Sequence, residues 1–334
     1  MPETGAKFTR ALPYTSPMSA SHEHEGTIPV NEAGNRLDQT LARMFPQYSR
    51  ARLQNWIRDG SVRVDGEAMR PRDAVYGGET VHLRAATEEV PSLAAEAIDL
   101  DIAWADDHLL VVNKPPGLVV HPGAGNPSGT LVNGLIHFDG RLAALPRAGL
   151  IHRLDKDTGG LLVVARTVEA FKQLTDAMSA RQITREYAAL CVGALTGGGT
   201  IDEPIGRHPV DRKKMAVHDR GRPARTHYRV ERRYRGYTLV AVTLETGRTH
   251  QIRVHFAHRR WPLVGDRVYG RRAVPRDASE RLREALQAFE RQALHARRLA
   301  FDHPVTGDRV EVTSELPEDF ARLLAILDDE QAVD

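Results

Sequence analysis

The chain has 334 residues, of which 41% are hydrophobic and 27% charged, a composition typical of a soluble globular protein with two or three domains. A single cysteine excludes a disulfide framework and a cysteine-rich zinc site, and no apolar run is long enough to span a membrane or to act as a secretory leader. We therefore expect a cytoplasmic protein. The net charge is only +2, so any attraction to nucleic acid must come from local blocks of charge.

Two such blocks are basic. Residues 36–84 carry nine arginines against six acidic residues, and residues 205–225 carry seven basic against two acidic residues. Residues 85–110 carry seven acidic residues and neither Lys nor Arg. A basic block can follow the phosphate backbone of a nucleic acid, although solvated surface is the more frequent explanation for any single block. The blocks indicate a nucleic-acid partner only in combination with other features.

The N-terminal part predicts a tail followed by a small folded unit. Residues 1–33 are rich in small and polar residues without periodicity, and predict a flexible N-terminal tail. Residues 34–84 predict two short helices, the second capped by Ser49, and a few short strands. Arginines on the outside, including Arg50 and Arg52, favour a small RNA-binding module. The apolar positions behind this prediction are Leu37, Leu41, Met44, Phe45, Leu53, Trp56, Ile57, Val62, Val64, Val81 and Leu83.

The remainder predicts a linker, a larger unit and a short tail. Residues 85–100 are expected to be a linker, residues 101–326 the larger unit, and residues 327–334 a C-terminal tail. The larger unit predicts an α+β fold with a mixed, largely antiparallel sheet. A helix is expected over residues 279–299, with Leu282, Leu286, Phe289 and Leu294 as its apolar stripe, and strands over residues 109–112, 161–165, 187–192 and 237–242.

Common cofactor motifs are missing from the sequence. It has no GxxxxGK[ST] phosphate-binding loop, no GxGxxG after a strand and no HExxH zinc motif. We therefore expect a reaction that needs neither ATP, NAD nor a metal. A reaction that uses only a carboxylate, an arginine and an aromatic ring remains compatible with the sequence.

The segment most suited to such chemistry is residues 149–160, which read GLIHRLDKDTGG and precede an apolar run. This order predicts a polar loop that leads into a buried strand. Asp155 is then a carboxylate beside cations at the start of rigid structure, where it can act as nucleophile or base. A structural ion pair in a turn is the alternative explanation on chemistry alone.

A second segment, residues 181–187, reads RQITREY and places Tyr187 at the start of a predicted strand. The flat ring of Tyr187 can stack on an unpaired base, while its hydroxyl takes part in proton transfer. A half-buried strand tyrosine is the alternative.

A third segment, residues 245–256, reads ETGRTHQIRVHF. Thr249 is predicted to cap a helix whose inward face carries Ile252 and Phe256, which would fix Arg253 to a rigid element. If Arg253 faces the carboxylate of the first segment, the pair keeps that carboxylate ionised and oriented. A surface cation is the alternative.

Together, and in this order, the three segments resemble the RluA-type pseudouridine synthases, and residues 34–84 resemble an S4 RNA-binding domain. The resemblance runs from about Arg36 to the C-terminal region. One position departs from it, because Gly159 stands where the family commonly has Ser or Thr. Further shared stretches are NKP at 113–115, VVHPGAGNP at 119–127, HRLDKDT at 152–158, MAVH at 215–218 and RQALHA at 291–296.

The resemblance implies an RNA-modifying isomerase that needs no cofactor. Asp155 would be the catalytic aspartate, Tyr187 would pack against the target base, Arg253 would pair with Asp155, and Arg153 would fill the gap that a flipped uridine leaves in the RNA. The residues expected to bind RNA besides Arg153 are Arg248, Arg50, Arg52, Arg207, Lys213 and Lys214.

The stretches shared with one branch of the family also imply the substrate. This would be the clustered uridines of the helix 69 hairpin of 23S rRNA, on an assembling large ribosomal subunit, and we expect the enzyme to act as a monomer. The alternatives are a synthase for other rRNA or tRNA uridines and an RNA-binding assembly factor that has lost catalysis. A carboxylate glycosidase would need a second acid across the bond, and Asp157 is poorly placed for it.

Overall fold

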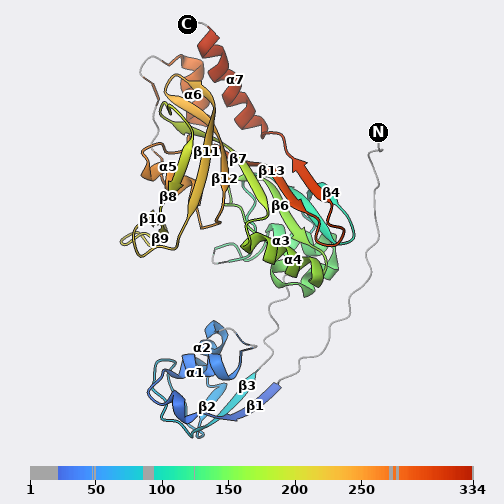
Figure 1. Cartoon of the computed structure of the whole chain (residues 1–334), viewed down its shortest axis with the longest axis vertical. Helices are drawn as coiled ribbons and strands as arrows, with labels where there is room; N and C mark the ends of the chain where they lie inside the picture. Colours follow the sequence, from blue (N-terminus) through green and yellow to red (C-terminus); the bar gives the residue numbers. More distant parts are fainter. Residues whose placement is uncertain are drawn as a thin grey trace. The chain divides into compact units, whose positions relative to one another are not determined.

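The computed structural model describes residues 22–46, 48, 50–85, 94–123, 125–270, 274–275 and 278–332. The chain divides into two compact units, Met1–Ser92 and Leu93–Asp334 (Figure 1). The division falls inside the segment expected to be a linker. Among the helices of the described residues, none combines the length and the apolar composition needed to cross a bilayer.

The first unit packs two helices against a small sheet. The strands follow the order β1-β3-β2 and are antiparallel, and the apolar residues predicted from the sequence form its core. The expected cap, Ser49, lies outside the described residues. The elements are β1 (His22–Thr27), η1 (Val30–Glu32), α1 (Leu37–Met44), α2 (Arg50–Arg58), β2 (Val62–Val64) and β3 (Thr80–Ala85).

The expected flexible tail over residues 1–33 is wrong for its second part. Strand β1 pairs with β3 along its whole length, and His24 lies against Tyr48, with Nε2 2.7 Å from the tyrosine hydroxyl. An edge strand is held mainly by backbone hydrogen bonds, so its side chains need not alternate between apolar and polar. The sequence HEHEGT therefore gave no strand signal.

The second unit is built on one large sheet with the order β4-β5-β6-β13-β7-β12-β11-β8, and β14 pairs with β13. Only β6 and β13 pair in parallel among the described strands, which confirms the expected largely antiparallel sheet. Strands β9 and β10 form a separate hairpin. The bounds are β4 (Asp101–Ala105), β5 (Leu109–Lys114), β6 (Gly159–Ala165), β7 (Thr184–Val192), β8 (Gly199–Asp202), β9 (Ile205–Arg207), β10 (Met215–Val217), β11 (Arg225–Tyr234), β12 (Tyr237–Leu244), β13 (Leu294–Asp302) and β14 (Arg309–Thr313).

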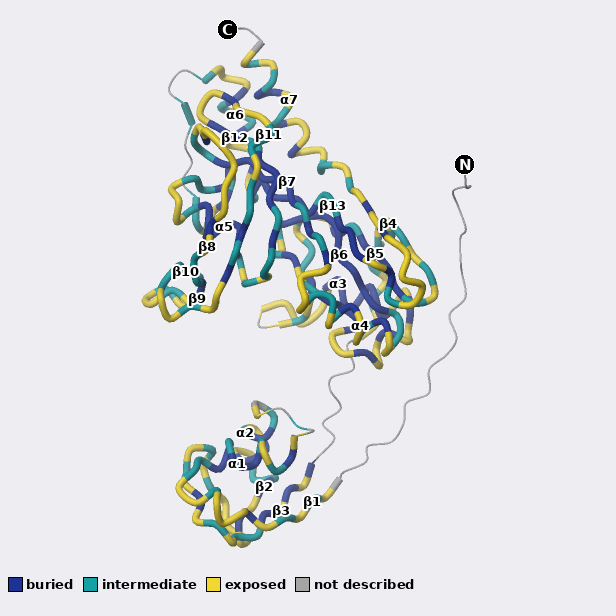
Figure 2. The backbone as a smooth tube through the Cα atoms, viewed as in Figure 1, coloured by how far each residue is buried: buried dark blue, intermediate teal, exposed yellow. Residues whose placement is uncertain are grey.

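Helices cover both faces of this sheet. Helices α3 and α5 pack on one face and share a core with Tyr187, whereas α4 packs on the opposite face of β5 and β6, and α6 with α7 covers that of β7 and β12. Figure 2 shows the central strands as the most continuously buried part of the unit. The bounds are α3 (Leu131–Phe138), η2 (Gly140–Ala144), η3 (Pro146–Gly149), α4 (Val168–Ser179), α5 (Gln251–His258), α6 (Glu280–Ala288) and α7 (Glu318–Ala332).

Two expectations near the C-terminus are wrong. The helix predicted over residues 279–299 ends at Ala288, and Leu294 begins strand β13 instead. Because β13 is buried on both faces, it shows no polar alternation that would mark it as a strand. The expected tail over residues 327–334 continues helix α7 to Ala332, with Leu327 in the core.

The second half of the expected linker, residues 94–100, belongs to the second unit. The carboxylate of Glu96 accepts hydrogen bonds from the backbone N–H of Gly129, at 3.1 Å. The side chain of Ile98 lies so close to Gly134 in α3 that a Cβ atom there would be 3.0 Å away. Acidic residues in this stretch thus take part in packing and not only in a solvated connection.

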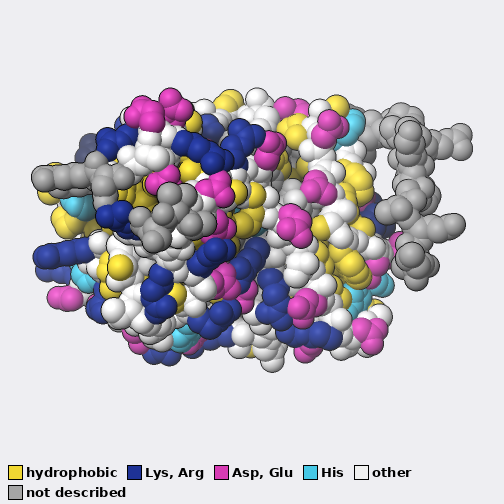
Figure 3. All heavy atoms as spheres, turned by 90° about the horizontal axis from the view of Figure 1, so that it is seen from above, with side chains coloured by type: hydrophobic (Ala, Val, Ile, Leu, Met, Phe, Trp, Pro, Cys, Tyr) yellow, Lys and Arg dark blue, Asp and Glu magenta, His cyan; other side chains and the backbone are white. Residues whose placement is uncertain are grey.

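The end of the second unit that carries α6 and α7 has no surface of a single charge sign. Figure 3 views the molecule from this end, and basic and acidic side chains are interspersed across it. Several are paired, with Arg281 2.8 Å from Asp329 and Arg291 2.6 Å from Asp319. This face is therefore a weak candidate for binding a phosphate backbone.

Candidate active site

A cleft of about 680 Å³ opens beside the core that contains Tyr187 and helix α5. Its walls come from the loop before β6, from the start of β7 and from the segment that joins β12 to α5. All three sequence segments singled out above meet here, although they are far apart in the chain. The predicted residues that line the cleft are Arg153, Asp155, Tyr187, Arg248 and Arg253.

The carboxylate of Asp155 is held by Arg253. Nη1 of Arg253 donates to Oδ2 of Asp155 at 2.9 Å. The arginine side chain is 7% exposed and the aspartate side chain 17%, so the cation is buried and the carboxylate reaches the cleft. A charge-assisted hydrogen bond of this kind fixes the orientation of the carboxylate. The predicted pair therefore forms in the structure.

Arg253 has a second and stronger partner that the sequence did not indicate. Nε and Nη2 donate to the two oxygens of Asp266 at 2.7 and 2.9 Å, and the Asp266 side chain is fully buried. Burial acts to raise the pKa of Asp266, but the hydrogen bonds and charge of Arg253, with backbone N–H groups of Val268 and Tyr269, bring it below its usual value. Asp266 thus fixes the plane of the guanidinium and leaves Nη1 for Asp155.

His250 and Tyr269 complete the surroundings of this arginine. The Tyr269 ring lies under the guanidinium, with 5.1 Å between the guanidinium carbon and the ring centroid. The Tyr269 hydroxyl lies 2.8 Å from Nδ1 of His250, whose Nε2 is 3.9 Å from Oδ1 of Asp155. Burial lowers the pKa of His250, the charge of Arg253 lowers it further, and Asp155 opposes the shift. The imidazole beside Asp155 is therefore neutral at neutral pH.

Tyr187 lies in β7, with 4% of its surface exposed, and lines the cleft. It is the fourth residue of the strand and not its first, because β7 begins at Thr184. Burial raises the pKa of its phenol, the charge of Asp155 acts in the same direction, and Arg185 opposes them. The phenol thus keeps its proton at neutral pH.

A buried lysine, Lys114, stabilises the loop that carries Asp155. Nζ of Lys114 donates to the carbonyls of Pro115, Leu118 and Lys156 at 2.8–3.0 Å. Burial lowers the pKa of Lys114 to about 7, against the charges of Asp157 and Asp155. Because Lys156 follows Asp155 directly, this contact restrains the backbone beside the Asp155 carboxylate.

The departure at Gly159 has a structural counterpart. A Cβ atom at Gly159 would lie 3.1 Å from Nδ1 of His295 and 3.1 Å from ring atoms of Pro116. Nδ1 of His295 is buried and has no hydrogen-bond partner among the described residues. A hydroxyl at position 159 would lie beside that nitrogen. Gly160, in contrast, has φ +111° and leaves only 2.2 Å between a Cβ atom and the Ala296 carbonyl oxygen, so no other residue fits there.

The other predicted RNA-binding residues occupy three places. Arg153 is exposed at the rim of the cleft, and Nε of Arg248 donates to the carbonyl of Pro223 at 3.1 Å. The residues Arg207, Lys213 and Lys214 belong to the β9–β10 hairpin and its connecting loop and do not line the cleft.

In the first unit, Arg50 and Arg52 lie on α2. Arg50 donates to the buried carboxylate of Asp38 at 2.9 Å, and the guanidinium of Arg52 lies over the ring of Trp56. Both arginines thus already contact residues of their own unit, with the Arg50 side chain 44% exposed.

The predicted cap of α5 is wrong. His250, and not Thr249, occupies the N-cap position, with the left-handed dihedral angles φ 56° and ψ 25° and no side-chain cap. The side chain of Gln251 instead stabilises the turn that precedes the helix, because its Oε1 accepts the backbone N–H of Arg248 at 2.9 Å. Sequence reasoning missed Asp266, His250, Tyr269 and Gln251. Of these, His250 and Gln251 lie inside the GRTHQIR segment, whereas Asp266 and Tyr269 stand in no recognised motif.

Comparison with known proteins gives two family matches. The family described as RNA pseudouridylate synthase matches residues 108–258, and the S4 domain family matches residues 35–81. The residues of the Asp155 and Tyr187 segments and Arg253 all fall inside the first match.

Proteins named ribosomal large subunit pseudouridine synthase D are similar over most of their length. The protein of Xanthomonas campestris is 52% identical over 92% of this chain and 93% of its own. That of Pseudomonas aeruginosa is 51% identical over 93% and 97%, and that of Escherichia coli K12 is 50% identical over 90% and 93%.

Two solved human structures are similar to the larger unit. RNA Pseudouridylate Synthase Domain Containing 4 is 29% identical, with a TM-score of 0.52, over 68% of this chain and 93% of its own. RNA Pseudouridylate Synthase Domain Containing 1 is 25% identical, with a TM-score of 0.53, over 72% and 96%.

Proposed function

The chain belongs to the RluA-type family of RNA pseudouridine synthases, and on this premise we propose that it converts uridine to pseudouridine in large-subunit ribosomal RNA. The observation that carries the proposal is the carboxylate of Asp155, held by Arg253 in an open cleft beside the ring of Tyr187. The names of the bacterial relatives, which align over most of both chains, support the same class of substrate.

We further propose that the target uridines are clustered in the helix 69 hairpin of 23S rRNA and are reached on assembling large subunits by a monomeric enzyme. The short stretches that the chain shares with one branch of the family support this choice, whereas the names of its relatives support only a substrate in the large ribosomal subunit. Modification of other rRNA or tRNA uridines is the competing outcome in the experiment described below.

A uridine must leave the RNA stack before its glycosidic bond can be rebuilt. Arg153 is placed to hold the gap open, because it is exposed at the rim of the cleft and stands two residues before Asp155. Leu154, between them, is buried, so the two polar side chains lie on either side of an anchored residue. A guanidinium offers both a positive charge and a flat face that can stack between bases.

The chemistry acts on the nucleotide that has entered the cleft. The N1–C1′ bond breaks, the uracil turns, and C5 is joined to C1′. A proton leaves C5 while N1 gains one, so no electrons or groups enter or leave overall. Asp155 is the group that we assign to this step, because it is the carboxylate that Arg253 holds toward the cleft. Its hydrogen bond to a buried guanidinium holds the carboxylate in one orientation for such a step.

In this proposal the ring of Tyr187 supplies the apolar surface on which the base stacks. The raised pKa of its phenol makes a phenolate base unfavourable at neutral pH. We therefore assign Tyr187 to stacking and to hydrogen bonding as a neutral phenol. Removal of the C5 proton then needs an acceptor other than Tyr187. The Asp155 carboxylate is the candidate, because it is close enough to the Tyr187 phenol to influence its pKa.

The S4-like unit and the β9–β10 hairpin are proposed to hold the RNA stem by its phosphates. On the hairpin, Lys213, Lys214 and Arg207 form a basic group, and the backbone N–H of Met215 donates to the Tyr269 hydroxyl at 2.9 Å. That contact joins the hairpin to the residues around Arg253. Binding at the hairpin therefore has a direct structural connection to the catalytic cleft.

The proposal is tested by mapping pseudouridines in the rRNA and tRNA of cells that lack this chain. We expect loss of pseudouridine from helix 69 and its return when the wild-type chain is supplied. Loss at other rRNA or tRNA positions would support the competing substrate. An unchanged map in all of these RNAs would contradict the proposal.

A further inference from the structure

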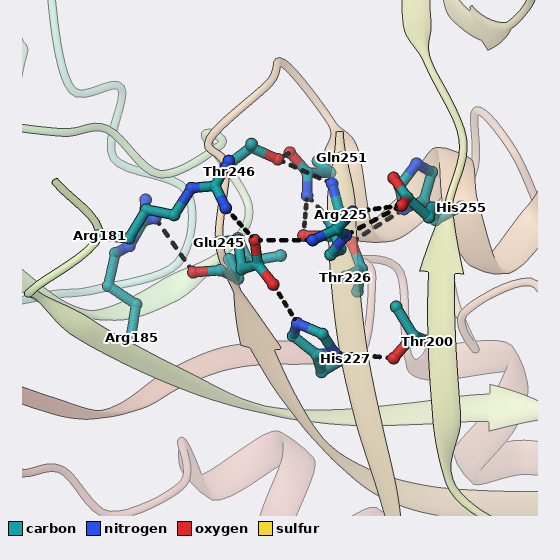
Figure 4. Close-up of polar contacts among 12 residues, drawn as sticks. Arg181, Arg185, Thr200, Arg225, Thr226, His227, Glu245, Thr246, Gln251 and His255 are labelled. Carbon is teal, nitrogen blue, oxygen red and sulfur yellow. Dashed lines mark hydrogen bonds and ion pairs between the residues drawn. The ribbon is translucent and has the colours of Figure 1, made fainter. Parts of the chain in front are cut away.

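The side chain of Gln251 is a buried polar group whose hydrogen-bonding capacity is fully used. It is 3% exposed. Oε1 accepts from the Thr246 hydroxyl at 2.8 Å and from the backbone N–H of Arg248 at 2.9 Å, while Nε2 donates to the Arg225 carbonyl and the Thr226 hydroxyl, both at 3.0 Å (Figure 4). A primary amide has two acceptor sites and two N–H donors, so none remains free.

These four contacts join a wall of the cleft to the sheet. Thr246 and Arg248 belong to the turn formed by residues 246–250, which lines the cleft, whereas Arg225 and Thr226 open strand β11. The backbone N–H of Arg225 also donates to the Thr246 hydroxyl, at 3.0 Å. The turn is thus attached to β11 through the Gln251 amide and through the Thr246 hydroxyl, and Figure 4 shows Gln251 between the two.

The turn needs such support because its backbone is strained. His250 has φ 56° and ψ 25°, a conformation that non-glycine residues rarely adopt. Strain of this kind persists only where neighbouring contacts hold it. The same turn carries Arg248 along the cleft and brings Nε2 of His250 within 3.9 Å of Asp155. A relaxed turn would displace both groups.

We propose that Gln251 is a positioning residue for the uridine isomerisation, whose amide holds the turn of residues 246–250 against β11 and so fixes the wall of the cleft that faces Asp155. The inference rests on the proposed function. Gln251 lines the cleft, but all four hydrogen bonds of its amide go to the turn and to β11 and none to Asp155. Its effect on catalysis therefore passes through the turn and not through contact with the reacting atoms.

His255 provides a matched control on the same helix. It is fully buried, its Nδ1 lies 2.8 Å from the Thr226 hydroxyl, and its Nε2 lies 2.9 Å from the Glu203 carbonyl. It thus fixes α5 to the same strand as Gln251 does. Its side-chain hydrogen bonds go to Thr226 and Glu203 and not to residues 246–250, and it does not line the cleft. Loss of its polar contacts weakens the docking of the helix and leaves the hydrogen bonds of the turn in place.

The experiment compares Gln251→Met with His255→Phe, two replacements that keep volume and remove polar contacts. Thermal unfolding gives the folded fraction of each, and steady-state kinetics on rRNA give kcat and KM. We expect both variants to lose stability. After correction for the folded fraction, we expect kcat to fall about 100-fold for Gln251→Met only, as for a displaced catalytic wall.

Thr246→Val keeps the test decisive if Gln251→Met does not fold. This change removes only the hydroxyl on the turn, and we expect an intermediate fall in kcat. Equal corrected kcat for the Gln251 and His255 variants, or a wild-type kcat for Gln251→Met or Thr246→Val, would overturn the inference. Absence of turnover in the wild-type chain would count against the proposed function itself, so the two failures are distinguishable.

Discussion

Arg253 donates to Asp155 through one nitrogen only, Nη1, at 2.9 Å. Its Nε and Nη2 are bound side-on by Asp266, which the sequence did not single out. The guanidinium therefore has a fixed plane before any substrate arrives. Catalysis depends on groups that are already oriented in the free enzyme. In our account Asp266, which does not line the cleft, is therefore as important as Asp155, which does.

Asp266→Asn is predicted to impair both stability and turnover. Loss of the charge leaves Arg253 buried with weaker support, which should lower the free energy of unfolding by about 3 kcal/mol. The freed guanidinium should also misplace Asp155 and lower kcat on the order of 100-fold. Chemical denaturation measures the free energy of unfolding, and steady-state kinetics measure kcat.

Glu311→Gln is the control, because Glu311 binds Arg298 side-on in the same manner, at 2.7 and 3.0 Å, outside the cleft. It should leave kcat unchanged. A similar fall in kcat for both variants would refute the assignment of Asp266.

Arg153→Ala is predicted to impair the opening of structured RNA more than the chemistry. If the inserted guanidinium offsets about 1.4 kcal/mol of the cost of unstacking, kcat/KM on a hairpin should fall about tenfold. On a single-stranded oligonucleotide with the same target uridine, the loss should be much smaller. Equal losses on both substrates would mean that Arg153 is an ordinary phosphate contact.

Gly159→Ser is predicted to be more stable than Gly159→Ala. Both variants place a Cβ atom 3.1 Å from His295 and Pro116, but only serine adds a hydroxyl that can bond to Nδ1 of His295. A buried polar atom without a partner costs about 1–3 kcal/mol, so the difference in unfolding free energy should approach that range. An alanine variant as stable as the serine variant would show that Nδ1 does not need this bond.

Lys114 predicts a specific dependence of stability on pH. Burial lowers its pKa from 10.5 to about 7 in the folded chain. Between these two values the unfolded chain binds a proton that the folded chain lacks. The free energy of unfolding therefore rises with pH over this interval, by at most about 1.4 kcal/mol per pH unit, and falls again as pH drops toward 7.

Urea denaturation of the wild type and Lys114→Met at several pH values isolates this contribution, because the other titrating groups are common to both. The wild type should gain stability relative to the variant as pH rises above 7. A difference that does not change with pH would contradict the shifted pKa.

The sequence singled out three residues that line the cleft, but not the residues that hold them in place. Asp155, Tyr187 and Arg253 each stand in a distinctive local segment, and the structure brings them to one cleft. Asp266 has no such context. Leu263 forms a β-bridge with Cys191 in β7, and this contact brings the following residues to α5, where Asp266 binds Arg253. No local sequence pattern encodes this long-range arrangement.

The errors in the fold have equally local causes. Strand β13 is buried on both faces, so its leading residue, Leu294, matched the spacing of the preceding helix. Strand β1 is a polar edge strand held by its backbone, and its sequence resembled a tail. Thr249 was expected to cap α5 because it is the usual type of capping residue, whereas His250 occupies the N-cap position with left-handed dihedral angles and no side-chain cap.

The most direct test of the account is the Asp155→Asn variant, which keeps the shape of the side chain and removes its charge. Release of tritium from C5 of labelled uridines in large-subunit rRNA reports the reaction, and equilibrium binding reports the affinity for the same RNA. We predict that the variant binds the RNA as the wild type does and releases no tritium. Release at the wild-type rate by the folded variant would contradict the central role of the Asp155 carboxylate.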